Sequence, residues 1–515
     1  MVAAGSPAEI EPLLGPGTRR IELAPDEVAL PGLTDSHLHL ADAAIASREI
    51  QLAGVASLEA GLDRIGGAHG AAAPGAWLTG NGWTADGWGG WPTAAALEQV
   101  APGRRVAIWA HDHHALWASP AALVEAKIGG GTADPPGGAI RRNEDGTPTG
   151  ILHEAATALV SRYIPAPTLA EYEAALPRIT RELAGLGVVS VHDPGSLRPD
   201  PHLAGAHVAY ANLSAAGRLA VRVHASIRAE ALDRAIERGW RSGQPLGDDP
   251  GSRARVGWLK LFADGSLGSR TARMLASFEP GSPPSGPADR GMWVTEPDAL
   301  IELTRRAAAG GFATQIHGIG DAAVRAALDA FESGASRSGP LRARVEHAQI
   351  VDPQDLARFG RLGIVASVQP VHLRSDADLA RRSWGARAER SSYAWRSLLD
   401  SGAVLAFGTD APVEPIDPWP GIALAIDRRW PDWPVGAGRF GADEALALEQ
   451  ALRGACLGPA QAEGSLDRGR LVAGQRADLV VIPAASITEP IESGGPLAST
   501  RPRLVVIDGA VAFEA

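Results

Sequence analysis

Cysteine is almost absent from this chain of 515 residues, in which Cys456 is the single example. An intrachain disulfide is therefore excluded, and so is a metal site built on cysteine thiolates. Long apolar runs are missing as well, because no stretch approaches the roughly 20 residues that a membrane-spanning helix needs. The first residues lack a basic segment followed by an apolar run, so we expect no secretory signal and a cytoplasmic location.

Basic residues are the minority among the charged ones. The 48 lysines and arginines stand against 59 aspartates and glutamates, which gives a formal net charge of −11. Proteins that bind nucleic acid or anionic membranes usually carry a basic excess, so we expect neither partner here. The length of the chain allows a large core and more than one domain.

Short apolar runs alternate with helix-like stretches from residue 28 to about residue 455. Most runs are rich in Val, Ile, Leu and Phe and show little internal alternation, as expected for strands buried on both faces. Eight such units favour an α/β fold built on a closed (β/α)8 TIM-like barrel. The predicted strands are 28–39, 188–193, 220–227, 256–263, 312–317, 344–348, 364–369 and 403–410. Predicted helices include 169–186, 297–310 and 322–332.

Two regions depart from this alternation. The stretch between strands one and two, at about 74–164, is too long for a loop, and we predict an inserted subdomain over the mouth of a barrel that spans 31–457. Strand-like runs also occur near both chain ends, and Asp508-Gly509 between two apolar runs is typical of a hairpin turn. We predict that residues 1–30 and 458–515 form a small β-sandwich.

His37 and His39 end the first predicted strand. Residues at positions i and i+2 of a strand point to the same face, so these two imidazoles can bind one metal ion. The carboxyl end of a strand is also the catalytic mouth of a parallel β/α barrel. The alternative is an edge strand that carries two solvated histidines.

Four further residues occupy matching positions on other predicted strands. They are Lys260, His317, His347 and Asp410. A barrel brings strand ends together, so four imidazoles, one amine and one carboxylate would converge at its mouth. Such a set suits divalent metals, zinc above the others. Each residue alone is more often structural, as a hydrogen-bonded histidine, a capping aspartate or a snorkelling lysine. The coincidence of all six carries the prediction.

The motifs together resemble those of the amidohydrolase superfamily, in particular the large-insert branch that includes N-substituted formamide deformylase. Residues 30–39 (LPGLTDSHLH) resemble the first-strand signature of that branch, and residues 260–272 (KLFADGSLGSRTA) resemble its most specific motif. The later ligand motifs lie at 317–321, 346–349 and 408–412, and two motifs of the insertion lie at 112–119 and 150–155. The likeness spans nearly the whole chain.

The resemblance implies one or two divalent metal ions at the mouth of the barrel. His37 and His39 would hold a buried ion, with Asp410 completing its ligands. His317 and His347 would hold a second ion.

The resemblance also implies the chemistry of the site. Lys260 would bridge both ions if CO₂ carboxylates its amine. Hydroxide formed from water at the metal would attack a carbonyl carbon, while Asp410 takes up a proton and passes it to the leaving nitrogen. We therefore predict hydrolysis of a non-peptide C–N bond, such as that of an amide or formamide. The alternatives are an esterase or amino-heterocycle deaminase of the same fold, and a metal-free binding protein, which the presence of all six candidates disfavours.

A small molecule is the predicted partner, with a homodimer left open as the state of assembly. Trp83 and His114 of the insertion are the candidates for substrate contact, and His114 is favoured over its neighbour His113. Arg270 is the candidate for holding an anionic group of the substrate. The alternatives are that Trp83 packs the insertion and that Arg270 forms a structural ion pair.

Overall fold

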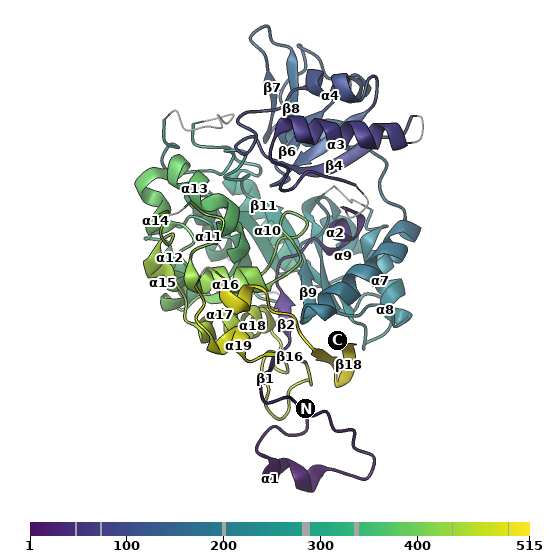
Figure 1. Ribbon diagram of the computed structural model, residues 1–515. Helices are drawn as coiled ribbons and strands as arrows, with labels where there is room; N and C mark the ends of the chain where they lie inside the picture. Colours follow the sequence, from purple (N-terminus) through teal and green to yellow (C-terminus); the bar gives the residue numbers. More distant parts are fainter. Residues whose placement is uncertain are drawn as a thin grey trace.

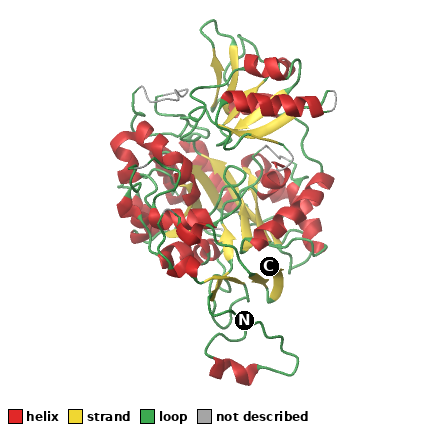
Figure 2. Cartoon of the chain, viewed as in Figure 1, coloured by secondary structure: helices red, strands yellow, loops and turns green. Residues whose placement is uncertain are grey.

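A barrel of eight parallel strands forms the centre of the molecule, with helices around it (Figures 1 and 2). The computed structural model describes residues 1–46, 49–72, 75–197, 202–280, 289–333, 339–434, 436–492 and 494–515. The strand order is β15-β14-β13-β12-β11-β10-β9-β2, and the Ser36 N–H donates to Phe407 O at 2.9 Å, which closes the barrel. The predicted fold is confirmed. The strands are β2 (Leu33–Asp35), β9 (Val188–Asp193), β10 (Arg222–Arg228), β11 (Ala254–Phe262), β12 (Thr314–Gly318), β13 (Arg344–His347), β14 (Val365–Val368) and β15 (Val404–Phe407).

Helices cover the outside of the barrel. The longest of them, α7, begins at a capping box in which the Thr168 hydroxyl accepts from the Glu171 N–H and the Glu171 carboxylate accepts from the Thr168 N–H. None of the described helices is long and apolar enough to cross a membrane. The helices are α2 (Leu40–Ala46), α7 (Leu169–Gly185), α8 (Ala206–Ala215), α9 (Leu232–Glu237), α10 (Pro297–Ala309), α11 (Asp321–Glu332), α12 (Leu356–Leu362), α13 (Leu373–Trp384), α14 (Ala388–Ser391), α15 (Trp395–Asp400), α16 (Trp419–Asp427), α17 (Leu448–Ala455) and α18 (Leu457–Ala462).

The run at 28–39, predicted as one strand, contains two strands that belong to different sheets. β1 (Glu27–Pro31) pairs antiparallel with β16 (Leu479–Pro483), whereas β2 pairs parallel with β9 in the barrel. The chain changes sheets at Gly32, where a Cβ atom would lie 2.5 Å from Val189 Cγ1. Only glycine allows the backbone to pass so close to a neighbouring strand. The prediction was therefore wrong in treating the run as continuous.

Both chain ends contribute to one antiparallel sheet with the order β1-β16-β17-β18. The predicted hairpin turn is present, because Asp508 and Gly509 have φ values of 54° and 81°, as a type I′ turn requires. Where a sandwich was predicted, the described residues form this single sheet, since the N-terminal segment adds only β1 and extends away from the body (Figure 1). The remaining elements here are α1 (Pro7–Ile10), β17 (Leu504–Ile507), β18 (Ala510–Glu514), α19 (Ala485–Thr488) and α20 (Gly495–Ala498).

The insertion is a mixed sheet of six strands that stands over the barrel mouth (Figure 1). Its first strand, β3, pairs with β4, so the inserted sheet begins ahead of residue 74, the start that the sequence pattern suggested. Its strands are β3 (Ile50–Gln51), β4 (Leu78–Trp83), β5 (Val106–Ala110), β6 (Ala115–Ala118), β7 (Gly138–Arg142) and β8 (Pro148–Glu154). Its helices are α3 (Leu58–Ala71), α4 (Ala94–Val100), α5 (Pro120–Glu125) and α6 (Ala158–Ser161).

Candidate metal centre and active site

A cavity of about 460 Å³ lies between the barrel mouth and the insertion. The barrel contributes all six predicted ligand residues to its lining, namely His37, His39, Lys260, His317, His347 and Asp410. The insertion contributes Trp83 and His114. Arg270 is not among the residues that line the cavity. The structure thus brings eight of the nine predicted site residues to one place.

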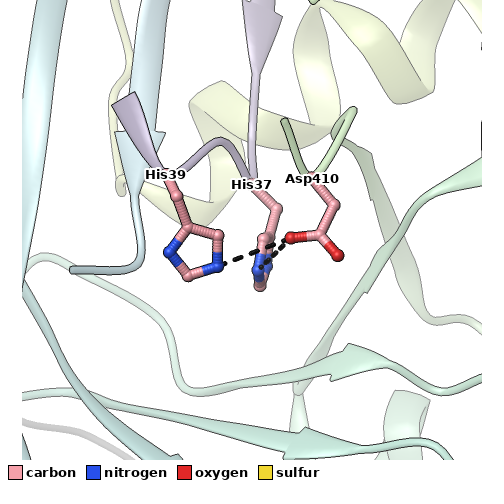
Figure 3. Close-up of side chains that lie close together, drawn as sticks. All are labelled: His37, His39 and Asp410. Atoms are coloured by element: carbon pink, nitrogen blue, oxygen red, sulfur yellow. Dashed lines mark ion pairs between the residues drawn. The ribbon is translucent and has the colours of Figure 1, made fainter. Parts of the chain in front are cut away.

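His37, His39 and Asp410, which line this cavity, form a buried trio (Figure 3). The Nε2 atoms of His37 and His39 lie 3.3 and 3.5 Å from Asp410 Oδ1. His37 Nδ1 donates to Glu346 Oε2 at 2.5 Å, and His39 Nδ1 donates to Gly195 O at 2.6 Å. When Nδ1 carries the only ring proton, the lone pair of Nε2 is directed toward Asp410 in both residues. This is the tautomer that a metal-binding histidine needs.

His317 and His347 lie beside this trio at the ends of β12 and β13. Their ring centroids are 4.4 Å apart, and the His347 ring is 5.0 Å from that of His37. His317 Nε2 donates to Gly265 O at 2.9 Å, which leaves the lone pair on Nδ1. Burial holds the pKa of both histidines well below the ordinary value, so both are neutral and able to bind a metal.

Lys260 of β11 is 1% exposed and lines the same cavity. Its Nζ atom has no hydrogen-bond partner among the described residues and lies 4.6 Å from the centroid of the Phe262 ring. Burial lowers the pKa of Lys260 to about 8, against the nearby carboxylates of Glu346 and Asp410, which raise it. At neutral pH a larger fraction of Lys260 is therefore in the neutral amine form than is usual for an exposed lysine.

A second polar chain, which the sequence analysis did not identify, extends from Asp410. His372 donates from Nε2 to Asp410 Oδ2 at 3.1 Å, and its Nδ1 lies 3.6 Å from Glu414 Oε1. His111 Nε2 lies 3.3 Å from the same Glu414 oxygen. Burial opposes a charge on His372, but the two carboxylates raise its pKa to about 10. A signal was available, because His372 follows the predicted strand 364–369 by three residues.

His347, His372 and Asp410 form another group with metal-binding spacing, since their ligand atoms lie within 4.8 Å of one another. The contacts of His372 argue against a ligand role, because its Nε2 donates to Asp410 Oδ2 and its Nδ1 faces Glu414 Oε1. A protonated imidazole has no free lone pair to offer a metal. His372 is better placed to donate a hydrogen bond that orients the Asp410 carboxylate.

Buried polar groups continue from the trio into the interior of the barrel. Glu346, which accepts from His37, pairs with Arg344 Nε at 2.5 Å. Arg344 Nη1 donates to His192 Nδ1 at 2.9 Å, and His192 Nε2 donates to Glu463 Oε1 at 2.7 Å. Burial would raise the pKa of Glu346, but Arg344 and His37 hold it well below the ordinary value. Each charged side chain in this buried hydrogen-bonded series has a partner, as buried charges require.

Deeper in the barrel, His192, His224 and Glu463 also have metal-binding spacing. His192 offers no lone pair, because Nδ1 accepts from Arg344 while Nε2 donates to Glu463. Arg468 pairs with the second oxygen of Glu463. Two guanidinium groups beside these side chains would repel a cation. We interpret this cluster as a polar part of the core.

His114 of the insertion lies beside His317, one of the candidate metal ligands. Its Nδ1 donates to Glu154 Oε2 at 2.8 Å, and its ring centroid lies 5.1 Å from that of His317. Burial opposes a charge on His114, but Glu154, followed by Asp112, raises its pKa to about 9. His114 therefore places a positive charge at the roof of the cavity at neutral pH.

The loop after β11 joins the insertion to the barrel. Asp264 accepts from the backbone N–H groups of Ile319 at 3.0 Å and Gly320 at 2.8 Å, which fixes the start of this loop. Gly265 follows at a point where a Cβ atom would lie only 2.0 Å from Glu154 Oε1. The glycine is required because the insertion approaches the backbone directly.

Trp83 and Arg270 occupy different surroundings. Trp83 is 1% exposed, and its Nε1 donates to Ile108 O at 2.9 Å. Its polar atom is therefore already used, and it offers the cavity an apolar ring. Arg270 lies with its guanidinium 4.5 Å from the centroid of the Phe278 ring, outside the cavity lining.

Comparison with known proteins identifies the family to which this chain belongs. A model of the amidohydrolase family matches residues 24–513. The chain is 32% identical over 499 residues to Protein LONG AFTER FAR-RED 3 of Arabidopsis thaliana, covering 95% of this chain and 83% of that protein. It is 26% identical over 536 residues to N-substituted formamide deformylase of Arthrobacter pascens, covering 99% and 92%. The solved structure of an uncharacterized metal-dependent hydrolase from Pyrococcus horikoshii OT3 superposes with a TM-score of 0.68 at 28% identity, covering 89% and 86%. The chain belongs to the amidohydrolase family.

Proposed function

We propose that this protein is a metal-dependent hydrolase that cleaves a non-peptide C–N bond, such as that of an amide or formamide, in a small molecule. The observation that carries this proposal is the trio of His37, His39 and Asp410, in which two free Nε2 atoms and a carboxylate oxygen face one point of a deep cavity. The family match and the Pyrococcus structure support a metal-dependent hydrolase. The relative named N-substituted formamide deformylase supports the class of bond.

The side chains of the cavity fit a divalent ion. His37 Nε2 is buried and has no hydrogen-bond partner among the described residues, a loss of about 1–3 kcal/mol that a metal bond would offset. Imidazole nitrogens and carboxylate oxygens are ligands that zinc favours, and we propose zinc. His317, His347 and Lys260 would hold a second ion beside it.

Lys260 has the properties of an amine that CO₂ can carboxylate. Reaction with CO₂ requires the neutral amine, and the lowered pKa of Lys260, about 8, makes this form accessible. The product is an anionic carbamate in place of an unpaired buried ammonium, which is costly in the core. We therefore propose that Lys260, as its carbamate, would help to hold both ions.

When bound, the ion supplies Lewis acidity, which lowers the pKa of water and polarises a carbonyl group. Asp410 accepts the proton of the attacking water and returns it to the leaving nitrogen. Burial would raise the pKa of Asp410, but His37 and His372 hold it well below the ordinary value. The carboxylate is thus ionised at the start of the reaction, and it passes on a proton readily. His372, bonded to Oδ2, fixes the direction of this carboxylate.

The insertion supplies the proposed substrate contacts. Trp83 presents an apolar ring, and His114 presents a positive charge close to the metal-site histidines. This combination suits a substrate with an apolar or aromatic substituent and a polar oxygen near the scissile bond. Arg270 could reach such a substrate only by leaving the Phe278 ring, so we propose Trp83 and His114 as the main contacts.

The test is a substrate panel run on protein of known metal content. Purified protein would be stripped by a chelator, reloaded with zinc and assayed on N-substituted formamides, amides, matched esters and amino-heterocycles. We expect hydrolysis of formamides or amides that disappears with the metal and returns with zinc. Turnover of esters or heterocycles alone would contradict the class of bond, and unchanged turnover in metal-free protein would contradict the metal.

A further inference from the structure

A second cavity, of about 100 Å³, opens at the base of the barrel, where the amino ends of β10 and β11 lie. This end is opposite the mouth that carries the candidate active site. Among the described residues that line this basal pocket, none is acidic. Its polar lining consists of Ser252, His224 and five arginines, Arg222, Arg253, Arg255, Arg468 and Arg476.

Carboxylates behind the arginines offset most of this charge. The four that pair with them are Asp478, Asp508, Asp467 and Glu463. Five guanidinium groups against four carboxylates leave one positive charge in excess. His224 adds none, because burial lowers its pKa to about 3. The charged side chains that line the basal pocket are therefore all cationic, although the whole chain is acidic and Asp249 lies beside the lining residue Gly251.

Arg255 is the arginine without a carboxylate partner among the described residues. Its Nη1 donates to Gly243 O at 2.9 Å and its Nη2 donates to Pro250 O at 3.1 Å. Burial lowers the pKa of Arg255, and the nearby charges of Arg468 and Arg476 lower it further. Three cations thus share one small space, where an anion would relieve their repulsion.

Two buried nitrogen atoms of the basal pocket residues also have no hydrogen-bond partner among the described residues. They are Nη1 of Arg468 and Nδ1 of His224, a residue that is 97% buried. Buried polar atoms are nearly always hydrogen-bonded in folded proteins. Nη1 of Arg468 is a donor that needs an acceptor, and an oxygen atom of a bound ligand would supply one.

We propose that the basal pocket binds a tetrahedral oxyanion of the phosphate class, as inorganic phosphate or as the phosphoryl group of a small metabolite. Guanidinium groups bind phosphate through paired, charge-assisted hydrogen bonds. By this measure a cavity needs about 10–15 Å³ to hold one water molecule, so about 100 Å³ has room for such a group. Arg253 and Arg476, 33% and 45% exposed, mark the open side.

The competing explanation is a purely structural one. Arg222 pairs with Asp478 at 2.9 Å and also with Asp508, and these contacts join the barrel to the terminal sheet. Ion pairs that join the barrel to the terminal sheet need no ligand. It does not account for Arg255, which touches neither of these carboxylates.

The test is calorimetric titration of the full-length protein with inorganic phosphate, at ionic strength held constant with sodium chloride. We expect one saturable site, and thermal unfolding whose midpoint rises with phosphate along the same curve. Arg255→Met should weaken phosphate binding at least about tenfold, as expected for the loss of a charged hydrogen bond. Arg305→Met, an exposed arginine of α10 that pairs with Glu302, is the matched control and should bind phosphate normally.

Should Arg255→Met fail to fold, Arg476→Met at the rim gives the same comparison. A second titration with glycerol phosphate separates the two sources of the ligand. Tighter binding than that of inorganic phosphate assigns an organic phosphate, and weaker binding assigns the free ion. Absence of saturable binding to the parent protein would overturn the proposal, as would equal affinity in the parent and in the folded pocket variants.

Discussion

The mouth and the interior base of the barrel contain the same kinds of side chain, yet they differ in what those side chains can bind. At the mouth, His37 and His39 give their Nδ1 protons to a carboxylate and a carbonyl, which leaves both Nε2 atoms free. In the interior, His192 accepts from Arg344 and has no free lone pair. Histidines beside a carboxylate therefore do not identify a metal site. Whether a histidine can bind a metal depends on the hydrogen-bond partner of its other ring nitrogen.

The largest expected effect separates the two regions directly. His37→Ala or His39→Ala should remove the bound metal and lower kcat/KM by about 10³-fold, since a catalytic ion contributes several kcal/mol. His224→Ala in the interior should leave the metal content unchanged. Elemental analysis and activity of the purified variants measure both effects. Equal metal loss in all three variants would remove the distinction.

Asp410→Asn tests the proton transfer at the mouth apart from metal binding. The amide oxygen can still coordinate, but the side chain cannot accept and return a proton. We expect kcat to fall by at least about 10²-fold in zinc-loaded protein. A zinc-loaded Asn variant with near-normal kcat would show that another group carries the proton.

Glu346→Gln tests the side chain that connects His37 at the mouth to Arg344 in the barrel interior. The change weakens the hydrogen bond that sets the tautomer of His37 and should lower zinc affinity by about 10–100-fold. Glu463→Gln makes the same substitution in the interior and should destabilise the fold with little change in zinc affinity. Competition with a chromogenic chelator measures affinity, and denaturant unfolding measures stability. Equal zinc affinities in the two variants would contradict the assigned role of Glu346.

The interior should also show a dependence on pH. Burial lowers the pKa of His224 to about 3, whereas an unfolded histidine titrates near 6.5. Below pH 6.5 the unfolded chain binds a proton that the folded protein excludes, so acidification destabilises the fold. Between pH 6.5 and pH 5, His224 should account for about 2 kcal/mol of lost stability. His224→Gln should reduce this loss in urea unfolding. Identical pH dependence in the variant and the parent would contradict the neutral, buried state of His224.

The smallest effect concerns selectivity. Trp83→Ala and His114→Gln change groups that line the cavity without touching the proposed metal trio. We expect the relative kcat/KM values of the panel substrates to change by about tenfold, the scale of a few kcal/mol or less in pocket contacts. Zinc content should stay constant. An unchanged substrate ranking in folded, zinc-loaded variants would mean that the insertion supports the cavity without selecting substrates.

The sequence predicted the barrel because strands buried on both faces carry an apolar signal and parallel strand ends must meet at one edge. Six residues, distant in sequence, line one cavity for the same reason. The change of sheet at Gly32 was not predictable, because it depends on the approach of Val189. Nor was it predictable that Arg344 uses the lone pair of His192, since hydrogen-bond partners are set by tertiary contacts. His372 was detectable by its position after β14.

The measurement that tests the account most directly is anomalous diffraction at the zinc absorption edge from crystals of zinc-loaded protein. We predict a peak bonded to the Nε2 atoms of His37 and His39 and to Asp410, and no peak between His192 and His224. Zinc bound in the interior with none at the mouth, or no ordered zinc in a crystal of active protein, would contradict the assignment of the metal centre.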